Sequence, residues 1–302
     1  MNGIPSYLSP VSIIPGGCPQ FLDFSLREES IRRLRRYFRE EKKNQGDPDG
    51  RYTHYLRCLA ETENGFIDQL TGQPCDEDYS VEARRAVTAW DGHWLPIPFL
   101  RTLDQAWPDG GKRFECGPSN WARARVMQSE RHPDQLRIVL AFDTNVEQRP
   151  TEGDRYHALS PQDVAAHGHF MLAHLVRDNS WFLNEAWVDE WLCGIFDLWR
   201  QSQHRGRGSW KDDTPYVLEH LANYLTWLDV VRMALNDLAA QVINPDRDTP
   251  VDVDLVLDIG NSRTTGILVE TLPQRVTNLN DSYLLDLRDL SIPENIYSDP
   301  FE

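Results

Sequence analysis

The residues best suited to chemistry lie in one short stretch, 258–266, which reads Asp-Ile-Gly-Asn-Ser-Arg-Thr-Thr-Gly. Gly260 permits a tight turn and a close approach of the backbone to a ligand, because glycine has no Cβ atom. Successive N–H groups in such a turn form a concave anion site. A carboxylate repels phosphate, so Asp258 would act through the water shell of Mg²⁺, which prefers oxygen ligands. Short hydroxyl and amide donors surround the turn: Asn261, Ser262, Thr264 and Thr265.

Two apolar runs flank this stretch and would position it. Between 253 and 257, apolar residues occupy every second position, which predicts a half-buried β-strand that becomes fully apolar at its end. Residues 267–269 predict a second strand, and residues 283–287 predict a third after a turn over 271–280. Asp258 would then stand at the end of the first strand, on a rigid backbone. An ordinary β-hairpin with a polar turn would show the same pattern, so both interpretations stay open.

This strand–loop–strand pattern resembles the first phosphate loop of the actin, Hsp70 and sugar-kinase superfamily, and its form Asp-Ile-Gly-Asn-Ser-Arg is most similar to that of type III pantothenate kinases. The resemblance implies the first strands of a ribonuclease-H-like, actin-type ATPase domain, with ATP and Mg²⁺ as cofactors. By position, Asp258 would hold the water shell of the metal, and Gly260, Asn261, Ser262 and Thr264 would line the phosphates. Asn261 departs from the threonine that is usual in actin and Hsp70 relatives.

The superfamily also needs a second acidic phosphate loop, a Gly-Gly turn for adenosine and a second subdomain, and the sequence ends at residue 302. We therefore expect the front piece of a longer protein, which would bind nucleotide and act as an ATPase or phosphotransferase, whereas this chain alone would be inactive. No catalytic residue is identified. The alternative is a non-catalytic assembly protein with a degenerate loop. A truncated sheet would leave an edge that pairs with other chains, so we expect protein partners or self-association.

The first 150 residues are punctuated by proline and glycine and predict a mixed α/β region. Apolar runs at 11–14 and 21–26 predict two strands joined by a turn. Residues 28–43 predict a surface helix with an apolar face and an arginine-rich face. Further predictions are a strand over 52–59, a packed loop over 90–99, a buried strand over 136–142 and a linker over 148–153.

Residues 151–247 predict a helical bundle. Ser160 is a favourable N-cap, with a proline at the first helical position. From Trp181 onward, apolar residues recur at three- and four-residue spacing, which indicates a helix that faces the core. A second stripe over 218–242, followed by an Asn-Pro pair, predicts another long helix packed antiparallel to the first. The whole chain is thus predicted to be mixed α/β (α+β) in three parts: 1–150, 151–247 and 248–302.

Histidines at 167, 169 and 174 are the closest set of possible metal ligands. On a helix, the first and last lie two turns apart, roughly 10 Å, which is too far to share one metal ion. We therefore expect surface histidines or satisfied core histidines. The Gly110-Gly111-Lys112 sequence lacks the first glycine and the final hydroxyl residue of a P-loop.

The composition narrows the possible partners. A formal net charge of −16 argues against a general nucleic-acid binder and against an anionic membrane surface. No apolar run reaches the ~18 residues of a transmembrane helix, and the first residues lack a signal-peptide pattern. The five cysteines are widely spaced and never form Cys-x-x-Cys, which is typical of free thiols in a reducing compartment. We expect a cytoplasmic protein with no membrane span and no nucleic-acid partner.

Both ends of the sequence resemble one bacterial family. Residues 13–24, Ile-Ile-Pro-Gly-Gly-Cys-Pro-Gln-Phe-Leu-Asp-Phe, are similar to the N-terminus of the virulence factor SrfB family, and residues 257–264 are similar to its internal phosphate-type loop. Residues 140–144 are a weaker match. Members are long cytoplasmic proteins of poorly defined activity. The resemblance therefore implies the N-terminal part of a virulence-associated protein, but it does not imply a reaction.

Overall fold

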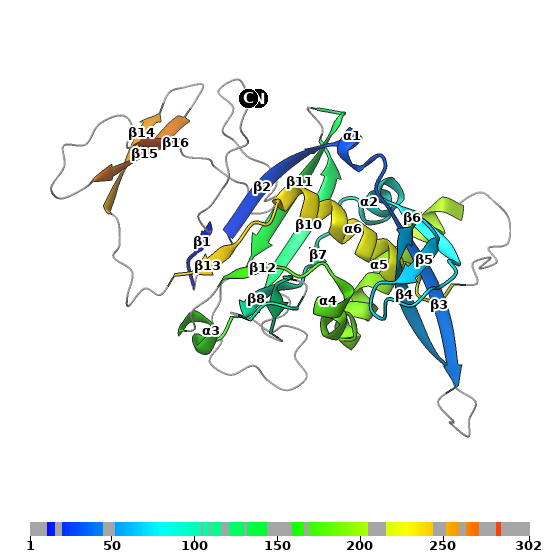
Figure 1. Cartoon of the computed structure of the whole chain (residues 1–302). Coiled ribbons are helices and arrows are strands. Elements are labelled where there is room, and N and C mark those ends of the chain that lie inside the picture. The colour runs from blue at the N-terminus through cyan, green and yellow to red at the C-terminus, as the bar shows by residue number, and fades with distance from the viewer. Residues whose placement is uncertain are drawn as a thin grey trace. The chain divides into compact units, whose positions relative to one another are not determined.

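The computed structural model describes residues 11–15, 20–44, 52–103, 105–108, 110–115, 121–129, 132–143, 159–165, 169–204, 216–243, 252–259, 264–271 and 282–284. These residues form a mixed α/β structure with several antiparallel sheets and six helices (Figure 1), which confirms the expected fold class at that level. Contacts divide the chain into two compact units, Met1–Val242 and Ile243–Glu302. The three-part division expected from the sequence stays a prediction, and the linker expected over 148–153 lies outside the described residues.

Three sheets build the first unit. A five-stranded sheet has the order β1-β13-β12-β8-β9, with bounds Val11–Ile13, Ala240–Val242, Phe170–Leu172, Phe99–Leu103 and Arg113–Phe114. A second sheet has the order β2-β11-β10-β7, with bounds Gln20–Arg27, Gln135–Phe142, Ala122–Gln128 and Leu95–Pro96. A third has the order β5-β4-β3-β6, with bounds Gly65–Asp68, Tyr52–Thr62, Arg35–Asn44 and Tyr79–Glu82. Since β13 pairs with β1 and β12 pairs with β8, the first sheet joins segments from opposite ends of this unit.

One helix, α6 (Glu219–Leu235), is buried on all sides at the centre of the first unit. Thirteen of its 17 residues are buried, and it lies against β2, β3 and β6 as well as against two other helices, α2 and α5 (Figure 1). The α2 helix brings three buried alanines to this packing, and small side chains let helices approach closely. The remaining helices have the bounds α1 Glu28–Ile31, α2 Ala83–Trp90, α3 Pro161–Ala165, α4 Val176–Leu183 and α5 Ala186–His204.

Several local predictions are confirmed. The strands expected over 52–59 and 136–142 are β4 and β11. Ser160 caps α3: its hydroxyl accepts a hydrogen bond from the Asp163 N–H at 3.3 Å, and the Asp163 carboxylate accepts one from the Ser160 N–H at 2.8 Å. The apolar stripe after Trp181 belongs to the core, where Trp187, Leu192 and Phe196 are buried.

The prediction of a helix over residues 28–43 is wrong. Only Glu28–Ile31 is helical, and the chain then forms β3, which pairs with β4 from Tyr37↔Leu59 to Asn44↔Tyr52. Arg36 and Phe38 are buried while Arg35 is exposed, a two-residue period that suits a strand. The many charged residues favour a helix locally, but pairing with β4 on one side and β6 on the other overrides that preference.

Three other expectations also need correction. The helix predicted over 218–242 ends at Leu235, because Asn236 adopts a left-handed conformation (φ 46°) and its N–H bonds to the Arg232 carbonyl. Residues 170–172, expected in a helix, form β12. The strands predicted over 11–14 and 21–26 are present as β1 and β2, but they belong to different sheets and form no hairpin with each other.

The buried helix α6 has charged partners along its length. The Arg36 guanidinium lies 3.3 Å from the Asp229 carboxylate and donates a hydrogen bond to the Leu225 carbonyl at 3.1 Å. At the start of the helix, the Glu40 carboxylate accepts hydrogen bonds from the N–H groups of Val217 and Leu218, both at 2.9 Å. Glu40, a residue of β3, therefore provides the acceptor for these two N–H groups. The start of α6 has no side-chain cap of its own.

Replacing Glu40 tests this long-range cap. Glu40→Ala should lower the free energy of unfolding by about 2 kcal/mol, because two helix-start N–H groups lose their acceptor. Chemical denaturation followed by circular dichroism measures the change. Glu63→Ala, in the exposed turn after β4, is the matched control and should stay within about 0.5 kcal/mol of wild type. Equal effects of the two substitutions would show that the cap does not stabilise α6.

Candidate functional site

The residues singled out for chemistry lie in the second unit, in a three-stranded antiparallel sheet. β14 (Asp252–Ile259) pairs with β15 (Thr264–Thr271) over eight residues, from Asp252↔Thr271 to Ile259↔Thr264. β15 then pairs with β16 (Ser282–Leu284), so the order is β14-β15-β16. The paired strands and the third strand expected from the sequence are thus present; β16 covers the first part of the predicted 283–287, and residues 260–263 and 285–287 lie outside the described residues.

The pairing brings part of the expected site together. Asp258 lies opposite Thr265, and Thr264 lies opposite Ile259 at the last pair before the turn. The other expected site residues, Gly260, Asn261 and Ser262, lie outside the described residues. A carboxylate-bearing position and two threonine-bearing positions therefore converge at one end of a closed hairpin. That backbone suits a phosphate turn and an ordinary hairpin equally well, so the roles assigned to these residues stay predictions.

The apolar residues of β14 are more exposed than its sequence predicts. Its four large apolar residues in this stretch have exposed fractions between 49% and 52%: Val253, Leu255, Val256 and Leu257. Alternate residues of a strand face opposite sides, so apolar groups are exposed on both faces. In β15 the corresponding stretch is better covered, with Gly266 buried and residues 267–269 partly buried. The expected strand is therefore present, but residues 253–257 do not form the buried face that their alternation predicts.

Other groups that could do chemistry have structural roles. The His220 ring lies 2.6 Å from the Asp189 carboxylate and joins α6 to α5. Its ring is 7% exposed whereas the Asp189 side chain is 51% exposed. A general base must reach its substrate. His220, which would be the base, is the buried member of the pair, so the pair does not suit that role. The sequence carries no signal for this pair, because no spacing rule links residues 31 positions apart.

No metal centre is found in the described part of the chain. Within it, no three His, Cys, Asp or Glu side chains lie close enough to hold an ion. Of the three histidines considered as ligands, His167 lies outside the described residues, and His169 precedes β12, where its carbonyl accepts a hydrogen bond from Thr102. His174 lies beside a small hollow at the end of α6. Burial raises the pKa of the Cys58 thiol to about 11, so this thiol is not a nucleophile at neutral pH.

The Asp189–His220 pair makes stability depend on pH. The hydrogen bond from His220 lowers the pKa of Asp189. A lowered carboxyl pKa stabilises the fold above the unfolded value, near 3.9, and that contribution disappears as the pH falls through the folded value. The gap in unfolding free energy between wild type and Asp189→Asn should therefore be present at pH 6 and shrink below about pH 4.

Denaturation across this pH range measures the gap. Asp197→Asn, on the same helix, is the control, because that carboxylate accepts from the Cys193 thiol instead. A gap that stays constant down to the acid limit of folding would rule out the linkage.

Comparisons with known proteins identify a family for this chain but no individual relative. No described helix is long and apolar enough to cross a membrane. No curated protein and no solved structure matches the chain. The family model described as "Virulence factor SrfB" matches residues 1–302. Since this match spans the whole chain, the protein belongs to the SrfB family of virulence factors.

Proposed function

We propose that the turn between β14 and β15 binds the phosphates of ATP together with Mg²⁺, as part of an actin-like nucleotide-binding domain. The supporting observation is the register: strand pairing continues to Ile259↔Thr264, so only the sequence Gly-Asn-Ser-Arg connects the two paired strands. Backbone N–H groups of a short glycine-containing turn suit an anion. The donor set of carboxylate, hydroxyl and amide groups also fits a hydrated magnesium ion beside a phosphate.

Each residue of this site has an assigned role in the proposal. Asp258 orients the water shell of the metal, and Gly260 lets the backbone approach the phosphates. The side chains of Asn261, Ser262, Thr264 and Thr265 donate hydrogen bonds to phosphate oxygens. Bound Mg²⁺ would neutralise charge on the phosphates. Hydrolysis or phosphoryl transfer needs further groups that residues 258–265 do not supply.

A titration with Mg-ATP, followed by thermal unfolding, tests the site. At 100 times its dissociation constant the ligand should stabilise a competent fold by about 2.7 kcal/mol. Asp258→Asn should weaken binding at least ~10-fold, because the metal shell loses its carboxylate. Asp252→Asn, at the far end of the same strand, is the matched control and should bind normally.

The titration should be made on this chain and on the longest natural form of the protein. Stabilisation of the longer form alone supports a site that needs additional residues. If neither form responds, or if Asp258→Asn binds as tightly as wild type, residues 258–265 are an ordinary hairpin.

The exposed β14 strand favours a second candidate, a non-catalytic assembly protein. β14 is an edge strand of the described sheet, with large apolar side chains exposed on both faces. Exposed apolar edges pair readily with other chains. The chain should therefore associate at high micromolar concentration, and Val256→Lys should weaken that association, because a charged edge opposes strand pairing.

Sedimentation velocity measures this association. Leu198→Lys, which changes a 64% exposed leucine on α5, is the matched control and should leave association unchanged. A wild-type chain that stays monomeric throughout the range would exclude assembly through β14.

A further inference from the structure

A small hollow lies in the first unit, where β12 passes the end of α6. One wall is formed by Met171, Leu172 and His174, and the other by side chains between positions 232 and 238 at the helix end. The hollow has a volume of about 10 Å³, which is room for about one water molecule. No organic ligand fits in it, so the charged groups in its walls act mainly on one another.

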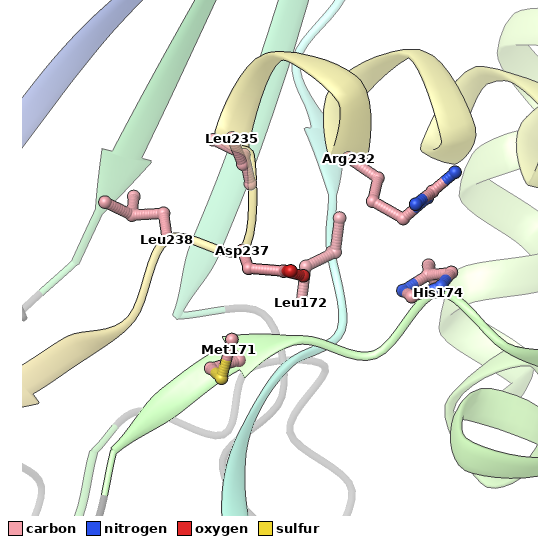
Figure 2. A pocket seen from close by; sticks show the side chains of 7 residues that line it. All are labelled: Met171, Leu172, His174, Arg232, Leu235, Asp237 and Leu238. Atoms are coloured by element: carbon pink, nitrogen blue, oxygen red, sulfur yellow. The ribbon is translucent and has the colours of Figure 1, made fainter. Parts of the chain in front are cut away.

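The His174 ring lies next to a positive charge. Figure 2 shows the Arg232 guanidinium above this ring, with both groups to one side of Leu172. The Arg232 Nε atom lies 3.8 Å from the Asp229 carboxylate, beyond hydrogen-bond distance, and the same carboxylate lies 3.3 Å from the Arg36 guanidinium. Because one carboxylate serves two guanidinium groups, the surroundings of the ring are net positive before the ring itself takes up a proton.

Two further charged groups lie at the hollow. Asp237 belongs to its wall, in the turn after α6. Lys112 lies on the β12 side, with its Nζ atom 2.7 Å from the Met171 sulfur. These two groups carry opposite charges, so together they leave the excess of positive charge around the ring unchanged.

A proton on the His174 ring would therefore be poorly stabilised where the ring now lies. An imidazolium has two N–H donors and a full charge, and both need acceptors or water. The ring is partly buried, and the hollow beside it has room for about one water molecule. The charged ring gains hydration, and escapes repulsion from Arg232, by moving away from α6 toward solvent.

Few other bonds hold the two walls together. β12 and β13 share a single register pair, Phe170↔Ala240, whereas β13 and β1 share three. The turn that joins α6 to β13 contains two residues with positive φ, Asn236 at 46° and Asp237 at 62°, a conformation that costs energy for residues other than glycine. Segments with few bonds and local strain open more easily than the rest of a fold.

We infer that His174 forms an acid-sensitive contact: when its ring takes up a proton, the segment that follows β12 separates from the end of α6. The neutral ring lies beside Arg232 and lets the two walls meet, whereas the charged ring repels the guanidinium. α6 leads through this turn into β13, the last described strand of the first unit, so acid loosens the end of that unit. This inference concerns the first unit and is independent of the nucleotide proposal.

The electrostatics of the ring agree with this geometry. Burial, and then the charge of Arg232, lower the pKa of His174, and Arg36 acts in the same direction. Asp229 and a hydrogen bond to the Leu172 backbone act in the opposite direction. A histidine pKa below its unfolded value, ~6.5, means that the closed contact is fully stabilised above that value. This stabilisation is lost as the pH falls through the folded pKa.

Proton NMR of the His174 ring, made on the whole chain, measures its titration. The midpoint should lie below that of a short peptide with the sequence of residues 170–178, in which the ring is not buried. Arg232→Gln removes a 43% exposed guanidinium and should raise the midpoint, because the repulsion is lost. Arg84→Gln removes an 81% exposed guanidinium from α2 and is the matched control, which should leave the midpoint unchanged. A midpoint at or above that of the peptide, or one that Arg232→Gln does not raise, would overturn the inference.

Hydrogen exchange tests whether the contact opens. Three backbone amides at the two walls are hydrogen-bonded in the closed form, those of Ala173, Asn236 and Leu238. Their protection factors, corrected for the intrinsic pH dependence of exchange, should fall at least ~3-fold between about pH 7.5 and about pH 5, because protonation favours the open form. The paired amides of β3 and β4 should keep theirs. Both pH values lie above the range in which Asp189 titrates, so that carboxylate does not contribute.

Two histidine variants assign the effect to this ring. His174→Gln has a neutral side chain at every pH and should abolish the fall in protection. His132→Gln, at an exposed position before β11, is the matched control and should show the same fall as wild type. Arg232→Gln should reduce the fall, which keeps the test decisive if His174→Gln does not fold. Protection that falls equally in wild type and His174→Gln, or that does not fall in wild type, would show that His174 is not an acid-sensitive contact.

Discussion

The ion pair between Arg36 and Asp229 is the constraint around which the first unit is built. Both side chains are about nine-tenths buried, and they lie 3.3 Å apart between β3 and α6. A buried charge without its partner costs several kcal/mol, so β3 and α6 must keep this alignment. The second hydrogen bond, from Arg36 to the Leu225 carbonyl, fixes the rotation of the helix as well as its distance. Sheet and helix are thereby held in one register.

The other polar contacts of α6 are explained by its burial on all sides. A helix with only one apolar face leaves its polar residues to water, but α6 must satisfy them internally. Glu40 supplies an acceptor at its start, Arg85 pairs with Glu219, and His220 pairs with Asp189. Each partner comes from a different element, so the helix holds β3, α2 and α5 in place.

Sequence patterns predicted the structure of segments that depend on neighbouring residues. They failed for segments whose structure depends on pairing with distant parts of the chain. The Ser160 cap, β11 and the paired strands that follow each other around Asp258 each depend on neighbouring residues, and each is present. The 28–43 segment has the composition of a helix, and only its pairing with β4 and β6 makes it a strand. The hollow at His174 could not be predicted either, because its walls meet only when Asn236 ends α6 and the chain returns as β13.

The two proposals for the second unit depend on each other physically. A phosphate turn is effective when its N–H groups are held rigidly before the ligand arrives. The β14 strand that carries Asp258 has apolar groups exposed on both faces, whereas strands with that pattern are usually covered on both faces. Covering β14, whether by a longer natural chain or by a partner, would rigidify the hairpin and so lower the entropic cost of ordering the turn around phosphate. Assembly and nucleotide binding would then be coupled. A nucleotide would bind more tightly to the form in which β14 is covered than to the form in which β14 is exposed.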